Sequence, residues 1–184
     1  MRPLLVPRLS LEPGLLRSWR LGDASALVAA WTDPEIARWN DVPSDPSLTV
    51  ARRWISGEQQ RLERRLSVDL ALDCPDIGGV VGEVGLSGFG VNHHGALIGY
   101  WLLPQARGQG LASKAVRAVT TWARQELGVD VVVARCHVDN VASQAVARRA
   151  GLAYHADDGP STQLWRSVEP AINGALEAPE TQVG

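Results

Sequence analysis

Apolar and polar positions follow distinct patterns along the chain, and each pattern predicts one kind of element. The clearest lies in residues 109–127, where small and apolar side chains share one helical face: Leu111, Ala115, Val116, Val119, Trp122, Ala123 and Leu127. That spacing predicts an amphipathic helix. Residues 96–103 (ALIGYWLL) are apolar on both faces, which predicts a central strand. Pro104 marks its end, because proline cannot donate to a β-ladder.

The other elements follow from the same kinds of pattern. Strands are predicted at residues 15–19, 66–72, 80–89, 131–138, 152–156 and 162–168. Helices are predicted at residues 20–31, 49–65 and 140–151, with a further helical turn starting at residues 33–35. Helices grouped before and between the strands in this order predict an α/β (mixed α+β) class with a mixed sheet.

Length and composition indicate a single domain. The chain has 184 residues, of which 45% are hydrophobic and 21% charged, as in an ordinary globular protein. We expect residues 1–168 to form this domain, with residues 1–14 as an irregular lead-in. Residues 169–184 are expected to be a flexible C-terminal tail.

Charge, cysteines and hydropathy limit the possible partners. The net charge of −2 does not indicate a nucleic-acid binder, so no specific nucleic-acid partner is expected. Cys74 and Cys136 make neither a disulfide framework nor a zinc site, so no metal is expected. No run approaches the roughly 20 apolar residues of a membrane span, and the N-terminal run is too short for a signal peptide. We therefore expect a cytoplasmic protein without a membrane partner.

Residues 102–116 (LLPQARGQGLASKAV) place a glycine-bearing turn between a strand and a helix. The first N–H groups of a helix have no internal partner, and phosphates bind there, while glycine lets an anion approach the backbone. The P-loop string does not occur, and the dinucleotide fingerprint lacks its third glycine. On these residues alone, a tight turn and a phosphate cradle are both open.

Two motifs narrow the choice. Residues 107–112 fit R/Q-x-x-G-x-G/A, the pyrophosphate loop of the GNAT N-acetyltransferases, and residues 140–152 resemble that superfamily's second motif, N-x-x-S…A…x-G-[FL]. The segment CHVDNVASQAVARRAGL is similar to the branch that acetylates ribosomal-protein N-termini, the RimJ/RimL type. The resemblance covers residues 9–168. It implies a central mixed, mostly antiparallel sheet of six to seven strands, flanked by helices, with a V-shaped splay between the two central strands.

The resemblance implies acetyl-CoA as acyl donor and no metal. Backbone groups at the strand end would pair with the pantetheine arm and polarise the thioester carbonyl, and the glycine loop would hold the pyrophosphate. The residues implied in cofactor binding are Trp101, Leu102, Leu103, Arg107, Gly108, Gln109, Gly110, Leu111, Ala112, Ser113, Asn140 and Ser143. Arg107 alternatively is a solvated turn residue, and Asn140 is also a candidate helix N-cap.

The catalytic residues are less determined. Ser143 either protonates the leaving thiolate, as the resemblance implies, or is an exposed helix serine. Many relatives use a tyrosine further along that helix, where this chain has Ala147. Glu83 is the best candidate base, because it interrupts an apolar strand beside the cofactor strand; the alternative is that it points to solvent. Asp157, Asp158 and His137 are weaker candidates, and His93 and His94 are expected to be turn residues.

Trp31, Trp39, Trp54 and Trp101 either line the acceptor side or belong to the core. The first acceptor implied is the N-terminal amine of a protein or peptide. The alternatives are a small-molecule amine or a lysine, a longer acyl-CoA as donor, and a non-catalytic acyl-CoA-binding module. A homodimer is left open.

Overall fold

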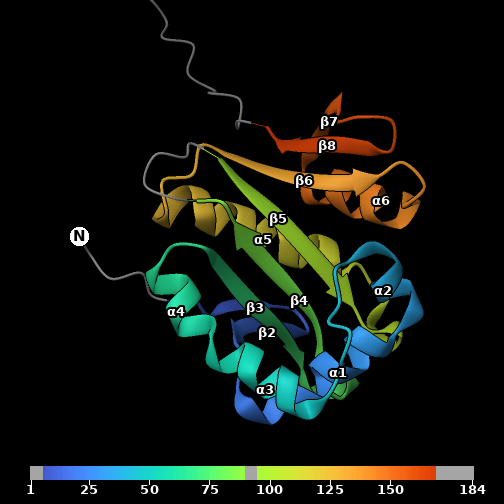
Figure 1. Cartoon of the computed structure of the whole chain (residues 1–184). Helices are drawn as coiled ribbons and strands as arrows, with labels where there is room; N and C mark the ends of the chain where they lie inside the picture. The colour runs from blue at the N-terminus through green and yellow to red at the C-terminus, as the bar shows by residue number, and fades with distance from the viewer. Residues whose placement is uncertain (1–5, 90–94, 169–184) are drawn as a thin grey trace, which may run out of the picture.

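The computed structural model describes residues 6–89 and 95–168 (Figure 1). Within those residues, eight strands form one sheet in the order β1-β2-β3-β4-β5-β6-β8-β7. The strands are β1 (Leu9–Leu11), β2 (Gly14–Ser18), β3 (Ser67–Cys74), β4 (Gly79–Ser87), β5 (Gly95–Leu102), β6 (Val131–His137), β7 (Leu152–Asp157) and β8 (Thr162–Ser167). Neighbouring strands are antiparallel except β5 and β6, which are parallel. The predicted mixed, mostly antiparallel sheet is confirmed, with eight strands in place of six to seven.

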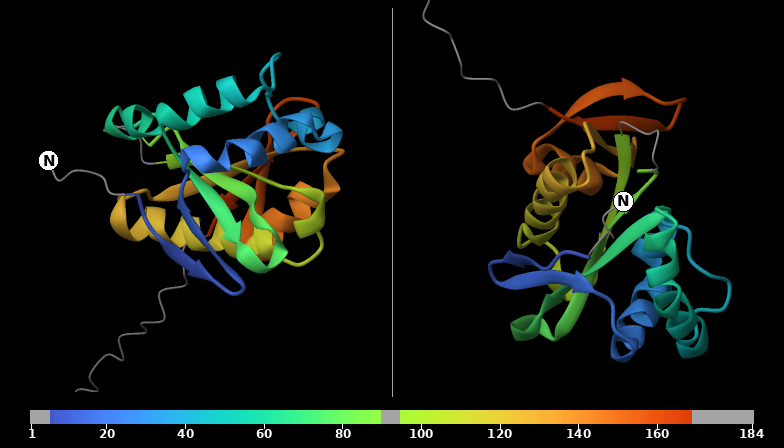
Figure 2. Two further views of the ribbon diagram at one scale, coloured as in Figure 1. Left: turned by 90° about the horizontal axis from the view of Figure 1, so that it is seen from below. Right: turned by 90° about the vertical axis from the view of Figure 1, so that its left-hand side faces the viewer.

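The helices cover the two faces of the sheet (Figure 2). They are α1 (Ala24–Thr32), α2 (Pro34–Trp39), α3 (Leu48–Ser56), α4 (Glu58–Glu63), α5 (Leu111–Glu126) and α6 (Val141–Ala150), with short 3-10 turns η1 (Leu21–Asp23), η2 (Pro75–Ile77) and η3 (Pro104–Ala106). α5 and α6 pack on one face, and α1 to α4 lie over the other (Figure 2).

The alternation of β5 divides its side chains between the two faces. Ile98 and Tyr100 pack in the main core beneath α5, whereas Trp101 packs with the second cluster of buried residues beneath α1 and α3. Successive residues of a strand point to opposite faces, so one short strand contributes to both sides of the molecule. The site described below uses this division.

Two predicted elements differ from the structure. Leu9–Leu11 form β1 inside the segment expected to be irregular; three residues give too short a pattern to predict, and the strand is held by pairing with β2. The helix predicted at residues 49–65 is two helices, because Gly57 ends α3 and its N–H returns to Arg53 and Trp54 carbonyls. His93, His94 and residues 169–184 lie outside the described residues. No helix within the described ranges is long and apolar enough to cross a membrane.

Candidate active site

A fork between β5 and β6 is the central feature of the sheet. The two strands pair only between Gly95–Leu97 and Val131–Val133. β5 then runs on to Leu102 and β6 to His137 without further pairing between them. The diverging strand ends, with α5, α6 and α2, line a cleft of about 420 Å³. The V-shaped splay implied by the sequence resemblance is therefore present at the predicted strand.

The loop before α5 forms one wall of this cleft. Gly108 and Gly110 have φ values of +76° and +74°, a left-handed conformation that glycine adopts without steric cost. A Cβ built on either glycine meets no atom within 4 Å, so the space over both is open. The N–H groups that begin α5 lack partners inside the helix, and the helix dipole adds partial positive charge. The loop therefore suits a pyrophosphate bound through backbone amides.

Ser113 fits the same anion. It is 7% exposed and lines the cleft, and its Oγ has no hydrogen-bond partner among the described residues. A buried hydroxyl without a hydrogen-bond partner destabilises the protein. A bound phosphate oxygen would remove this cost by accepting a hydrogen bond from the hydroxyl. Leu111 and Ala112 also line the cleft. The Gln109 side chain does not: its amide donates to the Gln105 carbonyl at 3.0 Å, which leaves only the backbone of Gln109 for the predicted cradle.

Arg107 is exposed, and its side chain makes two contacts that hold the loop in place. Its Nε donates to the Leu102 carbonyl at 3.0 Å, and its Nη2 forms an ion pair with Asp33 at 2.9 Å. Asp33 in turn caps α2 by accepting the Ile36 N–H. Arg107 is thus an exposed turn residue that also connects the end of β5, the glycine loop and α2.

Leu103 does not belong to the cleft, contrary to the prediction. Its side chain is buried against Ala30 and Ile36, and its N–H donates to the Val81 carbonyl at 2.8 Å. The register of β4 with β5 continues one residue beyond the strand and occupies the donor that a cofactor would need. Trp101 and Leu102 do line the cleft, as predicted.

Ser143 lies in the cleft on the first turn of α6, and Asn140 caps that helix by accepting the Ser143 N–H at 2.9 Å. The Tyr100 hydroxyl, which the sequence analysis missed, donates to the Ser143 carbonyl at 2.8 Å and lies 3.0 Å from its Oγ. Cys136 Sγ is 3.3 Å from the same Oγ. Burial raises the pKa of both Tyr100 and Cys136, so both keep their protons near neutral pH. Ser143 is thus surrounded by neutral hydrogen-bonding groups.

Glu83 lies on the opposite face of the sheet, in register with Trp101 on β5 and Ala71 on β3. Its Oε2 is buried without a hydrogen-bond partner within residues 6–89 and 95–168. Desolvation, followed by the charges of Asp69 and Glu58, raises the pKa of Glu83 well above its usual value. The alternative that Glu83 points to solvent is wrong.

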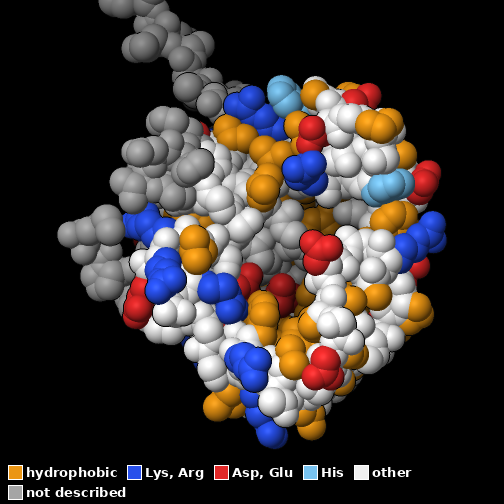
Figure 3. Space-filling model, viewed as in Figure 1, with side chains coloured by type: hydrophobic (Ala, Val, Ile, Leu, Met, Phe, Trp, Pro, Cys, Tyr) orange, Lys and Arg blue, Asp and Glu red, His pale blue; other side chains and the backbone are white. Residues whose placement is uncertain are grey.

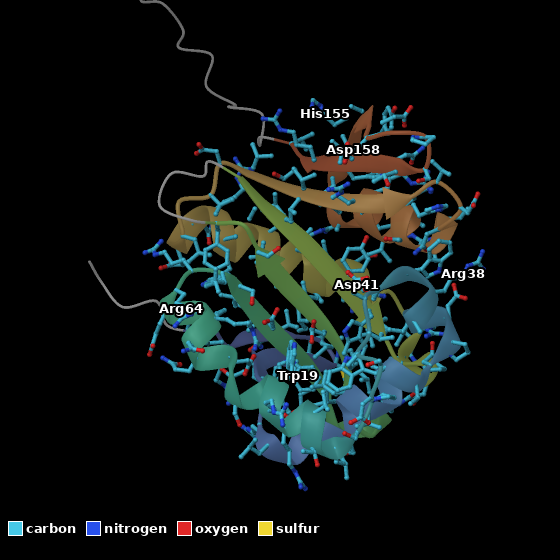
Figure 4. All side chains as sticks on the ribbon, in the orientation of Figure 1. Trp19, Arg38, Asp41, Arg64, His155 and Asp158 are labelled. Atoms are coloured by element: carbon cyan, nitrogen blue, oxygen red, sulfur yellow. The ribbon has the colours of Figure 1, made fainter. Side chains whose placement is uncertain are left out.

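The remaining candidates divide between core and surface. Trp31, Trp54 and Trp101 pack in the second cluster of buried residues, whereas Trp39 lines the cleft and its ring lies 5.2 Å from that of His137. Asp158, in the turn between β7 and β8, forms an ion pair with Arg135 on β6 at 2.6 Å. It lies far from Trp19 and from the helices over the other face (Figure 4). No cluster of His, Cys, Asp and Glu in the described part of the chain is arranged to hold a metal ion.

Comparison with known proteins decides the family. Residues 15–153 match the acetyltransferase (GNAT) domain family. The chain belongs to the GNAT acetyltransferases. It is an N-acetyltransferase, and the family match implies acetyl-CoA as its acyl donor. The pyrophosphate would be held by the loop from Gly108 to Ser113, and pantetheine would enter the fork beside β5.

Individual relatives are distant. The uncharacterised N-acetyltransferase YoaA of Bacillus subtilis is 23% identical over 147 residues, which are 80% of this chain and 83% of the relative. The fold resembles the ribosomal-protein-S5-alanine acetyltransferase of Vibrio fischeri (TM-score 0.78, 15% identity, 88% of this chain and 96% of that one). It also resembles RimL, a ribosomal-protein α-N-acetyltransferase solved with coenzyme A (TM-score 0.74, 22% identity, 88% and 98%).

Gly110→Val should abolish CoA binding while the protein stays folded. A β-branched residue at positive φ costs about 1–2 kcal/mol, and its side chain would fill the open space where phosphate oxygens approach. Isothermal titration with CoA and a thermal melt measure the two effects. Gly128→Val, at the opposite end of α5 with a φ of +68°, is the control for strain alone. Normal CoA affinity in the Gly110 variant would remove the cradle.

Glu58→Gln should stabilise the protein at pH 8 and lose this effect as the pH falls. Burial, with a smaller contribution from the charge of Asp69, raises the pKa of Glu58 to about 7 from a usual value of 4.5. The folded state therefore holds a proton that the unfolded chain releases, and wild-type stability declines between pH 4.5 and pH 7. After allowance for partial exposure we expect about 1–2 kcal/mol from urea unfolding at pH 8. An equal difference at pH 5 and pH 8 would contradict this assignment.

Proposed function

We propose that residues 1–168 act as one domain that acetylates the N-terminal amine of a protein or peptide. The observation that carries this proposal is the placement of Ser143 in the cleft beside Tyr100 and of Glu83 beside Trp101, on opposite faces of β5. A thioester lying in the fork beside β5 would have a proton acceptor on the side of α1 to α4 and a proton donor on the side of α6. Such a ternary arrangement suits direct attack of an amine, without an acyl-enzyme intermediate.

The attacking amine must be neutral. A chain N-terminus has a pKa near 8 and a lysine near 10.4, so an N-terminal amine needs less help at neutral pH. Glu83 is the proposed base: the same desolvation that raises its pKa makes its carboxylate a stronger proton acceptor. In the proposed step, Glu83 takes the ammonium proton, which neutralises a desolvated carboxylate whose Oε2 has no hydrogen-bond partner among the described residues.

The leaving group is then protonated on the other side of the fork. As the amine nitrogen forms its bond to the acyl carbon, the carbon–sulfur bond breaks and the thiolate takes a proton from Ser143 Oγ. The serine then regains its proton from solvent in the open cleft, and the Tyr100 hydroxyl, which donates to the Ser143 carbonyl at 2.8 Å, holds α6 against β5. Ser143 takes the place of the helix tyrosine that many relatives use, because this chain has Ala147 at the corresponding position and alanine has no proton to donate. Ala147 is also fully buried.

Thiol release with a panel of amines tests the proposal. We expect acetyl-CoA turnover with peptides carrying a free N-terminus, and none with the same peptides after N-terminal acetylation. Polyamines, aminoglycosides and N-blocked lysine peptides are the competing acceptors, and a higher kcat/KM with any of them would overturn the peptide assignment. Succinyl-CoA in place of acetyl-CoA measures the acyl preference. CoA binding without turnover on any acceptor would favour a non-catalytic module.

Ser143→Ala should lower kcat by about 100-fold, the lower end of the usual contribution of a positioned proton donor, while the Kd of acetyl-CoA changes little. Asn140 caps α6 independently of the serine hydroxyl, so the helix should remain intact. Single-turnover thiol release and titration calorimetry separate the two quantities. Ser10→Ala, which loses an exposed hydroxyl on the edge strand β1, serves as the control. An unchanged kcat would remove Ser143 from the reaction.

A further inference from the structure

Three carboxylates gather beneath α3 and α4, far in sequence from the acetyl-CoA motifs. Glu58 on α4, Asp69 on β3 and Glu83 on β4 form this acidic cluster: the charge of Asp69 raises the pKa of Glu58, and the charges of Asp69 and Glu58 raise that of Glu83. Among the described residues, Arg61 is the cation beside this cluster. Its charge lowers the pKa of Glu58 and of Glu83, and its Nε contacts Asp69 at 3.2 Å. Figure 3 shows acidic side chains at the floor of a hollow on this face. Three partly buried carboxyl groups beside one guanidinium leave room for further positive charge.

A cavity of about 210 Å³ adjoins the cluster. We call it the inner cavity; Trp19, Glu58 and Asp69 are among the side chains that line it. Trp19 is 5% exposed and lies between the sheet and α3 (Figure 4), where its ring packs against Trp54 and Trp101. Its Nε1 has no hydrogen-bond partner among the described residues, and neither does Nη2 of Arg61. A ligand in the inner cavity that satisfies the Trp19 donor must accept a hydrogen bond, and one that pairs with Glu58 and Asp69 must carry positive charge.

Two glycines connect the inner cavity with the fork. Asp69, Gly85 and Gly99 lie in register on three neighbouring strands, and Gly99 lines the acetyl-CoA cleft. A Cβ on Gly85 would lie 3.0 Å from Asp69 Oδ1, whereas one on Gly99 would meet nothing within 4 Å. Two strand spacings separate Asp69 from Gly99, or about 10 Å. An extended residue with an arginine or lysine side chain spans that distance.

We propose that the acidic cluster and the inner cavity form a subsite for a positively charged side chain at the first or second position of the acceptor peptide. This rests on the proposed function, and it places the peptide's N-terminal amine over Gly99, which lines the acetyl-CoA cleft. The guanidinium or ammonium pairs with Glu58 and Asp69, and peptide carbonyls accept from Trp19 Nε1 and Arg61 Nη2. A polyamine offers the charge without such acceptors, so the unpaired donors favour a peptide.

Arginine and citrulline differ in charge and almost nothing else, which makes them a matched pair of acceptor residues. Thiol release with tripeptides carrying arginine or citrulline at position 1, and a second pair substituted at position 2, should show a preference for arginine of about tenfold in kcat/KM at one of these positions. Equal kcat/KM within both pairs would overturn the proposal. No thiol release with any amine would instead mean that the proposed function itself is wrong.

Glu58→Gln removes one charge of the subsite at constant shape. The arginine-to-citrulline ratio should fall toward one in this variant, and it should keep its wild-type value in Glu63→Gln, the same substitution on the exposed side of α4. A tenfold preference that survives Glu58→Gln would contradict the subsite. Agmatine is a small amine with a guanidinium and no peptide carbonyl, so it tests whether the acceptor is a peptide or a small amine. A kcat/KM above that of the arginine peptides would overturn the choice of a peptide.

The pH dependence of wild type gives a second measurement that needs no variant. Glu58 faces Asp69, Arg61, Asp23 and the Trp19 backbone N–H, and it ionises near pH 7. The arginine-to-citrulline ratio should therefore rise between pH 6 and pH 8, since arginine stays charged and the titration of the terminal amine is common to both peptides. A ratio independent of pH would exclude Glu58 from recognition.

Discussion

The parting of β5 from β6 after three paired residues is the constraint on which the rest of the structure depends. A parallel pair that continued would fill the sheet and leave no cleft. Once the strands diverge, the inner edge of β5 beyond Leu97 has no strand beside it, and buried backbone groups need partners. A pantetheine arm, with its amides, can supply them. The fork therefore creates the space for the thioester and the backbone groups that recognise it.

Because β5 alternates, the fork presents different chemistry to its two sides. Tyr100 faces α6 and meets Ser143, while Trp101 faces α1 and α3 and shares its face with Glu83. A single strand thus separates a neutral, hydrogen-bonding side from a carboxylate side. Arg107 keeps the two sides in fixed relation, because its bonds to Leu102 and Asp33 join the glycine loop to α2 on the acceptor side.

Local sequence was sufficient for the features that are themselves local. The positive φ of Gly108 and Gly110, the cap at Asn140 and the place of Ser143 one turn later all depend on neighbours within a few residues. Tyr100 was missed because its partner is 43 residues away, although strand alternation would have placed it on the α5 face. Glu58 gave no signal at all: its burial depends on the break at Gly57 and on packing against β3. Leu103 was misassigned because the end of a β-ladder is set by the partner strand.

The overall charge of −2 conceals a division of charge that suits two oppositely charged substrates. Arg107, Arg135 and Arg149 line the cleft together with the positive end of α5, where the phosphates of CoA are expected. Glu58, Asp69 and Glu83 lie across β5, where the ammonium is expected. The CoA phosphates and the ammonium are therefore expected on opposite sides of β5, and the fork lies between them. The proton released by the amine moves toward the carboxylates, and the thiolate forms on the side richer in positive charge. The electrostatic field thus favours charge separation in the direction that the reaction requires.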